Sequence, residues 1–133
     1  MISTKGRYAL RVMLDLAQQD EGIYVPLKDI AERQQISKKY LEIIVKDLVK
    51  AKLVKASSGK GGGYMLSRGA GEYSVGEILE ATEGSLASVA CLAGDEQTCP
   101  RAESCPTLPM WIEFDKMARD FFYSKKLTDL NER

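Results

Sequence analysis

Histidine is absent from this chain of 133 residues, tryptophan occurs once and cysteine three times. Without histidine, the Ser–His and Cys–His pairs that activate many enzymatic nucleophiles cannot form. The glycine-rich run GKGGGY also lacks the G-x4-G-K-[ST] spacing of a phosphate-binding loop. These absences argue against an enzyme.

Long apolar runs are missing as well. No stretch reaches about 18 apolar residues, so we expect no transmembrane helix and no membrane partner. The first residues, MISTKGRYALRVML, lack the apolar centre and small-residue cleavage site of a secretion signal. We therefore expect a cytoplasmic protein. In a reducing cytoplasm, three thiols more often bind metal or sense oxidants than form structural disulfides.

Net charge is zero, but the charges are unevenly distributed. Residues 1–68 contain 13 Lys/Arg and 7 Asp/Glu, whereas residues 69–133 contain 6 and 12. The first half therefore carries a positive charge that can meet phosphates, and the second half carries a negative charge that avoids them. A chain of this length is one domain, or one domain with an appendage.

Apolar periodicity predicts a mainly α fold of the winged helix-turn-helix class. We expect helices over about 4–19, 26–34 and 37–50, with Pro26 in the first turn of the second helix and Ser37 capping the third. Two short helices joined by about three residues form a helix-turn-helix, here over about 26–50.

After residue 50 the hydrophobic pattern changes from that of a helix to that of two strands joined in a hairpin. Residues 53–58 and 64–67 are predicted as strands around a glycine-rich loop, which makes a wing over about 53–67. Glycines at this tip allow close approach to a sugar–phosphate backbone. The winged helix-turn-helix domain is expected to span residues 1–83 and to end with a capped helix over about 75–83.

The second part of the chain divides into two segments. Residues 84–108 contain the cysteines and show neither helical nor strand periodicity. Residues 109–133 contain a long helix, over about 109–123, and a short terminal segment. One wide apolar face of this helix comprises Met110, Trp111, Phe114, Met117, Ala118, Phe121 and Phe122. We expect this face to pack against a second copy of the chain, as a dimerisation helix; the alternative is that the N-terminal helix buries it.

The basic helix-turn-helix predicts binding to double-stranded DNA. Lys38, Lys39 and Tyr40 lie in the first turn of the recognition helix, where side chains enter the major groove, and Glu42 can accept from a cytosine amino group. Basic residues on the first two helices, including Arg11, can contact phosphates, and Lys60 can reach the minor groove. The full set of DNA-binding candidates is Lys5, Arg7, Tyr8, Lys28, Ser37, Lys38, Lys39, Tyr40, Glu42, Ser58, Lys60 and Gly61.

The three thiols are candidate metal ligands. Cys91, Cys99 and Cys105 follow the spacing C-x7-C-x5-C. Structural zinc sites usually open with a shorter spacing and complete four ligands from cysteine and histidine, so the zinc interpretation is weaker. An iron–sulfur cluster accepts wider loops. Three thiolates leave a fourth position open, for which carboxylates, a hydroxyl, a backbone group, an exogenous ligand or a partner subunit remain candidates.

Several stretches resemble the IscR-type winged-helix regulators, which include NsrR and CymR regulators. They are STKGRYAL, VPLKDIAERQQIS, YLE, GGGY, VGEI and the cysteine loop ending in CPTLPMW. The resemblance covers essentially the whole chain. It implies a homodimer with crossed C-terminal helices, an iron–sulfur cluster on the three cysteines, and a role for Glu42 as the recognition-helix glutamate. The chain departs from the pattern at Leu108, where such proteins commonly carry histidine, at Arg7, where some carry a carboxylate ligand, and at Ser58, where many carry arginine.

These observations predict a dimeric transcription regulator that binds a pseudo-palindromic operator and senses an iron–sulfur cluster, most simply [2Fe–2S]. The resemblance implies genes for cluster assembly or sulfur metabolism as targets. One alternative keeps DNA binding but uses the thiols as an oxidation or nitric oxide sensor without a cluster. A second alternative is an iron–sulfur or zinc adaptor that binds protein instead of DNA.

Overall fold

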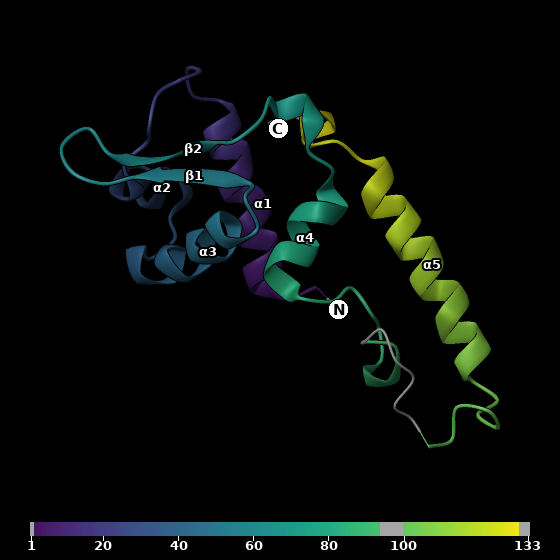
Figure 1. Ribbon diagram of the computed structural model, residues 1–133. Coiled ribbons are helices and arrows are strands. Elements are labelled where there is room, and N and C mark those ends of the chain that lie inside the picture. The colour runs from purple at the N-terminus through teal and green to yellow at the C-terminus, as the bar shows by residue number, and fades with distance from the viewer. Residues whose placement is uncertain (1, 94–99, 131–133) are drawn as a thin grey trace.

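The computed structural model describes residues 2–93 and 100–130 (Figure 1). Its helices and strands are, in chain order, α1 (Thr4–Ala17), α2 (Leu27–Gln34), α3 (Lys38–Lys50), β1 (Val54–Ser57), β2 (Gly63–Leu66), α4 (Val75–Glu83) and α5 (Leu108–Ser124). Short 3-10 helices span Ala70–Glu72, Ala90–Leu92 and Leu127–Asp129. The predicted mainly α fold, with a two-stranded wing after a helix-turn-helix, is confirmed.

Serine caps begin several of the helices. Ser37 Oγ accepts the backbone N–H of Tyr40, so α3 begins where its sequence predicts. Ser74 forms a capping box with Glu77 at the start of α4. Two predicted boundaries shift: Pro26 is the N-cap of α2 rather than part of its first turn, and α1 ends at Ala17 instead of near residue 19.

The main hydrophobic core lies between α1, α2 and α3 and extends to the base of the wing. It is formed by the apolar faces of these helices together with residues that follow them, namely Ala9, Val12, Met13, Leu16, Val25, Ile30, Ile36, Leu41, Ile44, Val45, Leu48, Leu53, Val54, Tyr73, Ile78 and Leu127. Each helix contributes the stripe that its periodicity predicts. The helix-turn-helix is therefore held as one unit by α1.

The wing is an antiparallel hairpin in which Val54 pairs with Leu66 and Ser57 with Gly63. The segment between α1 and α2 adds a single bridge to the hairpin, between Val25 and Tyr64. Both backbone hydrogen bonds of this bridge form, at 2.8 and 2.9 Å. The bridge attaches the free edge of β2 to the segment between α1 and α2.

Helix α5 runs alongside α4, apart from the helix-turn-helix (Figure 1). Phe122 and Tyr123 pack against a second core of Val75, Leu79 and Leu86. The expectation of one wide apolar face on α5 needs correction, because its neighbour α4 divides that face. Trp111, Ala118 and Phe122 are half-buried, whereas Met110, Phe114, Met117 and Phe121 are exposed. The alternative that α1 buries the apolar face does not hold, because α5 packs on α4.

After α5 the chain returns to the main core. Val75 donates its backbone N–H to the carbonyl of Lys125, and Leu127 donates to the carbonyl of Tyr73. The side chain of Leu127 is fully buried in the main core formed by α1, α2 and α3. The C-terminal end of α5 is thus tied to the start of α4 and to the main core. No helix within residues 2–93 and 100–130 combines the length and apolarity needed to cross a bilayer.

Candidate nucleic-acid interface and cysteine segment

The N-terminal half of α3 presents a polar face to solvent. Ser37, Lys38, Lys39 and Glu42 are all exposed, as their candidate roles at DNA require. The apolar stripe of α3 points the opposite way, into the core. A helix N-terminus also carries a partial positive charge, which favours phosphate nearby. The first turns of α3 can therefore approach a DNA groove without disturbing the core.

Tyr40 is less available than its neighbours on α3. Its ring packs edge-on against Tyr8 of α1, with ring centres 5.7 Å apart, and it is half-buried. The guanidinium of Arg11 lies 5.0 Å from the centre of the Tyr8 ring. Arg11 also donates to the side chain and backbone carbonyl of Gln34. Arg11 was expected to contact a phosphate. In the structure it instead links α1 to the end of α2.

The basic candidates on α1 and α2 differ in how available their side chains are to a DNA backbone. Lys5 forms an ion pair with Asp47 of α3 and is half-buried. Arg7 is exposed and donates to Thr4 Oγ1 at 3.2 Å. Lys28 is exposed on α2. Lys5 therefore links α1 to the recognition helix, whereas Arg7 and Lys28 remain open to a phosphate backbone.

A buried carboxylate holds the helix-turn-helix to α1, and sequence reasoning missed it. Asp15 is only 2% exposed and receives two hydrogen bonds from Arg33, at 2.8 and 3.0 Å, and one from Gln34 at 3.0 Å. The hydrogen bond from Arg33 to Asp15 raises the pKa of the guanidinium further above its ordinary value. The one sequence signal was a charged residue on the apolar side of α1.

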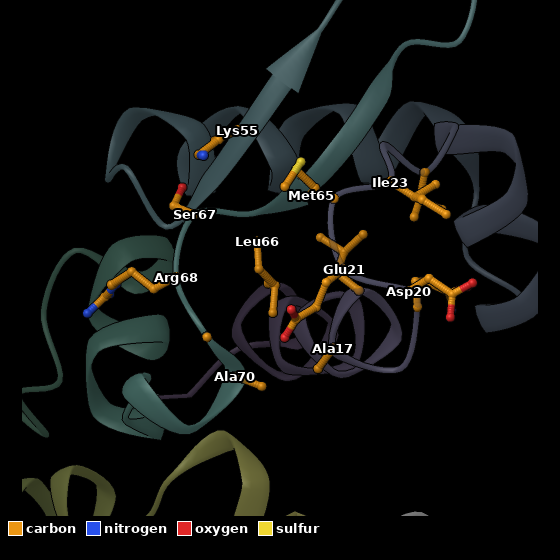
Figure 2. Close-up of a pocket in the computed structure, with 15 residues that line it drawn as sticks. Ala17, Asp20, Glu21, Ile23, Lys55, Met65, Leu66, Ser67, Arg68 and Ala70 are labelled. Atoms are coloured by element: carbon orange, nitrogen blue, oxygen red, sulfur yellow. The ribbon is translucent and has the colours of Figure 1, made fainter.

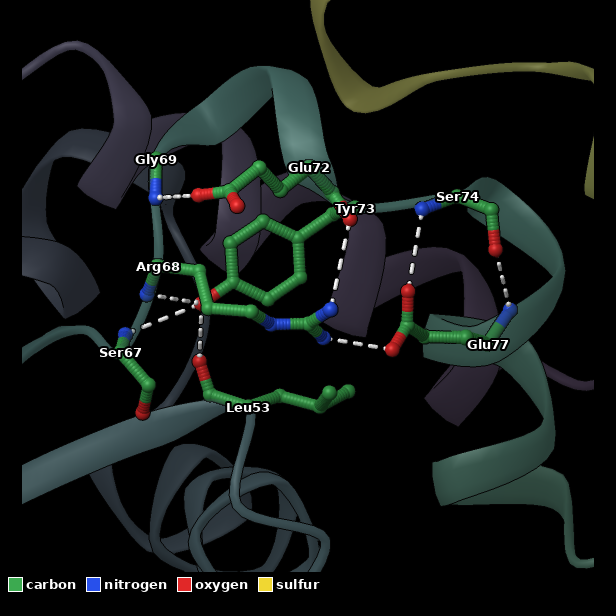
Figure 3. Close-up of polar contacts among 8 residues, drawn as sticks. All are labelled: Leu53, Ser67, Arg68, Gly69, Glu72, Tyr73, Ser74 and Glu77. Carbon is green, nitrogen blue, oxygen red and sulfur yellow. Dashed lines mark hydrogen bonds and ion pairs between the residues drawn. The ribbon is translucent and has the colours of Figure 1, made fainter.

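The wing tip exposes its remaining candidates, and one tyrosine fixes its base. Ser58, Lys60 and Gly61 lie exposed in the loop between the strands. At the other end of the hairpin, the hydroxyl of Tyr73 donates to the carbonyl of Leu53 at 2.6 Å and accepts from the backbone N–H groups of Ser67 and Arg68 (Figure 3). A single side chain thus joins the segment before β1 to the segment after β2.

Beside this base lies a cleft of about 330 Å³ between the wing and the end of α1. Figure 2 shows Lys55 and Arg68 on the side of the strands and Asp20 and Glu21 on the side of the α1–α2 loop. The Arg68 guanidinium pairs with Glu77. The Val25 bridge and the Tyr73 hydroxyl therefore add to the packing of Leu53 and Val54, which holds the base of the wing against the helices.

The cysteine segment, residues 84–108, begins directly after α4. Cys91 is half-buried and lies in the 3-10 helix Ala90–Leu92. The sequence predicted no helix in this segment. Cys105 lies just before α5, with its Sγ 3.4 Å from Thr107 Oγ1. This hydrogen bond, together with backbone N–H groups at the start of α5, lowers the pKa of the Cys105 thiol. Cys99 lies outside the described residues.

Side-chain hydrogen bonds near the start of this segment connect it to α5 and α1. The backbone N–H of Ser88 donates to both carboxylate oxygens of Asp115 on α5, at 3.1 and 3.3 Å. Glu83, the last residue of α4, accepts from the backbone N–H and hydroxyl of Ser3, at 2.9 and 2.7 Å. Ser3 is the N-cap of α1. The start of the cysteine segment is therefore hydrogen-bonded to α5 at Ser88, and it directly follows Glu83, which is hydrogen-bonded to the N-cap of α1.

The donor chemistry of the segment fits an iron–sulfur cluster in part. A thiol whose pKa is lowered by a hydroxyl hydrogen bond and by backbone N–H groups, as at Cys105, is a suitable thiolate ligand. Within residues 2–93 and 100–130, no three His, Cys, Asp or Glu side chains gather closely enough to hold a metal ion. Any site built on these thiols therefore needs Cys99 or another ligand in addition to Cys91 and Cys105.

Comparisons with known proteins agree with this architecture. A family model described as Rrf2, an iron-dependent transcriptional regulator, matches residues 2–133. The HTH-type transcriptional regulator IscR of Cronobacter sakazakii is 37% identical over 129 residues, which are 97% of this chain and 78% of that protein. Among solved structures, CymR, the global cysteine regulator of B. subtilis, has a TM-score of 0.75 and 32% identity over 97% of this chain and 94% of its own. IscR of T. potens has a TM-score of 0.74 and 35% identity, covering 97% and 84%.

Proposed function

The chain belongs to the Rrf2 family of iron-dependent transcriptional regulators, and we propose that it senses an iron–sulfur cluster through its cysteine segment. It is a DNA-binding transcription regulator rather than an enzyme. We assign DNA binding to residues 1–83, cluster binding to residues 84–108 and dimerisation to residues 109–133. Because it acts on DNA, we place the protein in the cytoplasm.

The proposed DNA contacts fall into two groups. Exposed Lys39 and Glu42 on α3 read bases in the major groove, because base edges are accessible there to side chains of a helix. Arg7, Lys28 and the wing-tip Lys60 contact the phosphate backbone, which positions the protein without reading sequence. Lys5 and Tyr40 act by holding α1 against α3.

Cys91, Cys99 and Cys105 are the proposed thiolate ligands of the cluster. The strongest support is the similarity to IscR over 97% of the chain, together with the lowered pKa of Cys105 at the start of α5. A cluster supplies a group that is gained, lost or chemically altered with iron supply and oxidants. We favour [2Fe–2S] with a fourth ligand that is not cysteine from this chain, since all three of its cysteines are used.

The exposed stripe on α5 supports a homodimer. Met110, Phe114, Met117 and Phe121 follow each other at steps of four, three and four residues, the spacing of a helix-helix seam. Large apolar side chains in such a row mark an interaction surface. A second copy of the chain presents the same row, and its two-fold symmetry matches a pseudo-palindromic operator.

The proposed coupling runs through the C-terminal end of α4 and the middle of α5. A change in the cysteine segment reaches α5 through the bond between Ser88 and Asp115. It reaches α1, and through the Lys5–Asp47 ion pair the recognition helix, by way of Glu83 and Ser3. A coupling of about 1–3 kcal/mol between cluster and DNA would change operator affinity roughly 5- to 150-fold.

The decisive experiment is anaerobic purification followed by visible absorbance and by iron and acid-labile sulfide analysis. Wild-type protein is expected to carry iron, sulfide and visible absorbance, and the variant Cys91→Ala/Cys99→Ala/Cys105→Ala to lose all three. Ser104→Ala, an exposed neighbour in the same segment, is the matched control and retains them. Absorbance that survives in the triple variant contradicts the ligand assignment. Wild-type protein that binds operator but contains no iron or sulfide would instead support the cluster-free thiol sensor.

A further inference from the structure

Ile43 is an apolar side chain exposed on the recognition helix. It is 50% exposed, although it lies in α3 between the buried residues Leu41 and Ile44. Among residues 2–93 and 100–130, the other large hydrophobic side chains with comparable exposure are Ile23 and members of α5. A single exposed isoleucine is common on protein surfaces, so exposure alone decides nothing. Its position on α3 is what carries meaning.

Helical geometry places Ile43 near the middle of the solvent face of α3. At 100° per residue, the buried stripe formed by Leu41, Ile44, Val45 and Leu48 leaves Lys39, Ile43 and Lys46 on the opposite side. Lys39 and Lys46 are exposed, as is Glu42 beside Ile43. Ile43 is therefore surrounded by the polar groups of the exposed face of α3, and its side chain has no hydrogen-bond donor or acceptor of its own.

We infer that Ile43 contacts the 5-methyl group of a thymine in each half of the operator. This inference rests on the DNA-binding function of α3. The thymine methyl is the apolar group that base pairs present in the major groove, where the other features are hydrogen-bond donors and acceptors. An isoleucine between Glu42 and two lysines covers such a methyl while its polar neighbours contact adjacent groups. Ile43 is then a specificity-determining residue.

The size of the effect follows from the burial of one methyl group. Burying one thymine methyl group lowers the dissociation constant for DNA about fourfold, and burying one in each of the two half-sites lowers it roughly 15-fold. The contact is apolar and involves no phosphate. The dependence of affinity on salt concentration is therefore expected to stay unchanged when Ile43 is truncated.

The test begins with duplexes enriched from a random pool by the wild-type protein. Each thymine of the enriched sequence is then replaced singly by deoxyuridine, which removes the 5-methyl group alone. One position in each half-site is expected to weaken binding about fourfold. The Ile43→Ala variant, which is altered in both protomers, should bind the thymine duplex roughly 15-fold more weakly and lose no further affinity on deoxyuridine replacement at that position.

Ile23→Ala is the matched control, because Ile23 is 53% exposed but lies in the α1–α2 loop. It should keep the full sensitivity to deoxyuridine. The inference is overturned if no thymine in the site is sensitive, or if Ile43→Ala retains the sensitivity of wild type. A pool that yields no enriched sequence would overturn the assignment of α3 as the recognition helix along with the role of Ile43.

Discussion

Removing the hydroxyl of Tyr73 tests whether one buried group holds the wing to the helices. Tyr73 is fully buried, and its hydroxyl makes three hydrogen bonds to backbone groups on both sides of the hairpin (Figure 3). Tyr73→Phe keeps the ring and its packing. The N–H of Ser67 retains a second acceptor, the carbonyl of Leu53 at 3.3 Å, whereas the N–H of Arg68 loses its partner.

The expected loss follows from these bonds. Each hydrogen bond contributes about 1 kcal/mol net, and a buried donor left without a partner costs about 1–3 kcal/mol. The surviving bond between Ser67 and Leu53 offsets part of this cost. We expect the free energy of unfolding to fall by about 2.5 kcal/mol, which for a chain of this length lowers the Tm by about 9 °C.

Urea denaturation at constant protein concentration measures the change, because association also affects apparent stability. Tyr24→Phe is the control: Tyr24 is half-buried, and its hydroxyl makes no hydrogen bond to the part of the chain that the structure describes. It should lose less than about 0.5 kcal/mol. If Tyr73→Phe is no less stable than this control, the hydroxyl does not hold the base of the wing.

Two further substitutions examine the wing and the dimer. Gly63→Ala should cost more than about 3 kcal/mol by urea denaturation, because φ is +149° and a Cβ there would lie 2.2 Å from the carbonyl oxygen of Val25. Gly59→Ala, also at positive φ but with open space around it, should cost about 1–2 kcal/mol; equal losses would refute the steric argument. Met117→Asp should shift the protein toward monomer in sedimentation velocity, since it places a charge in the exposed row on α5. Ile112→Asp, at a position that is also exposed but off that row, should not; a dimer that survives Met117→Asp would place the seam elsewhere.

The helix-turn-helix was predictable because local signals determine it. Ser37 caps α3 and Ser74 caps α4, and each helix buries the stripe that its sequence marks. The glycine-rich loop likewise predicted the wing. These features depend on residues a few positions apart, so they can be read without the fold.

The parts that could not be predicted depend on residues far apart in sequence. The bonds from Arg33 to Asp15 join two helices, and the position of Asp15 on the apolar side of α1 does not reveal which residue pairs with it. The division of the apolar face of α5 depends on where α4 lies, which periodicity does not specify. The withdrawal of Tyr40 toward Tyr8 has the same origin. For the candidate site, sequence identified the exposed groups on α3 but not which neighbours hold them in place.

The burial of Leu127 in the main core has a consequence for biosynthesis. During translation a chain emerges from the ribosome N-terminus first, so α1 to α3 emerge well before residue 127. Their hydrophobic interior stays incomplete until the cysteines and α5 have also been translated. A nascent polypeptide therefore finishes its DNA-reading head only after the parts that would regulate it have left the ribosome.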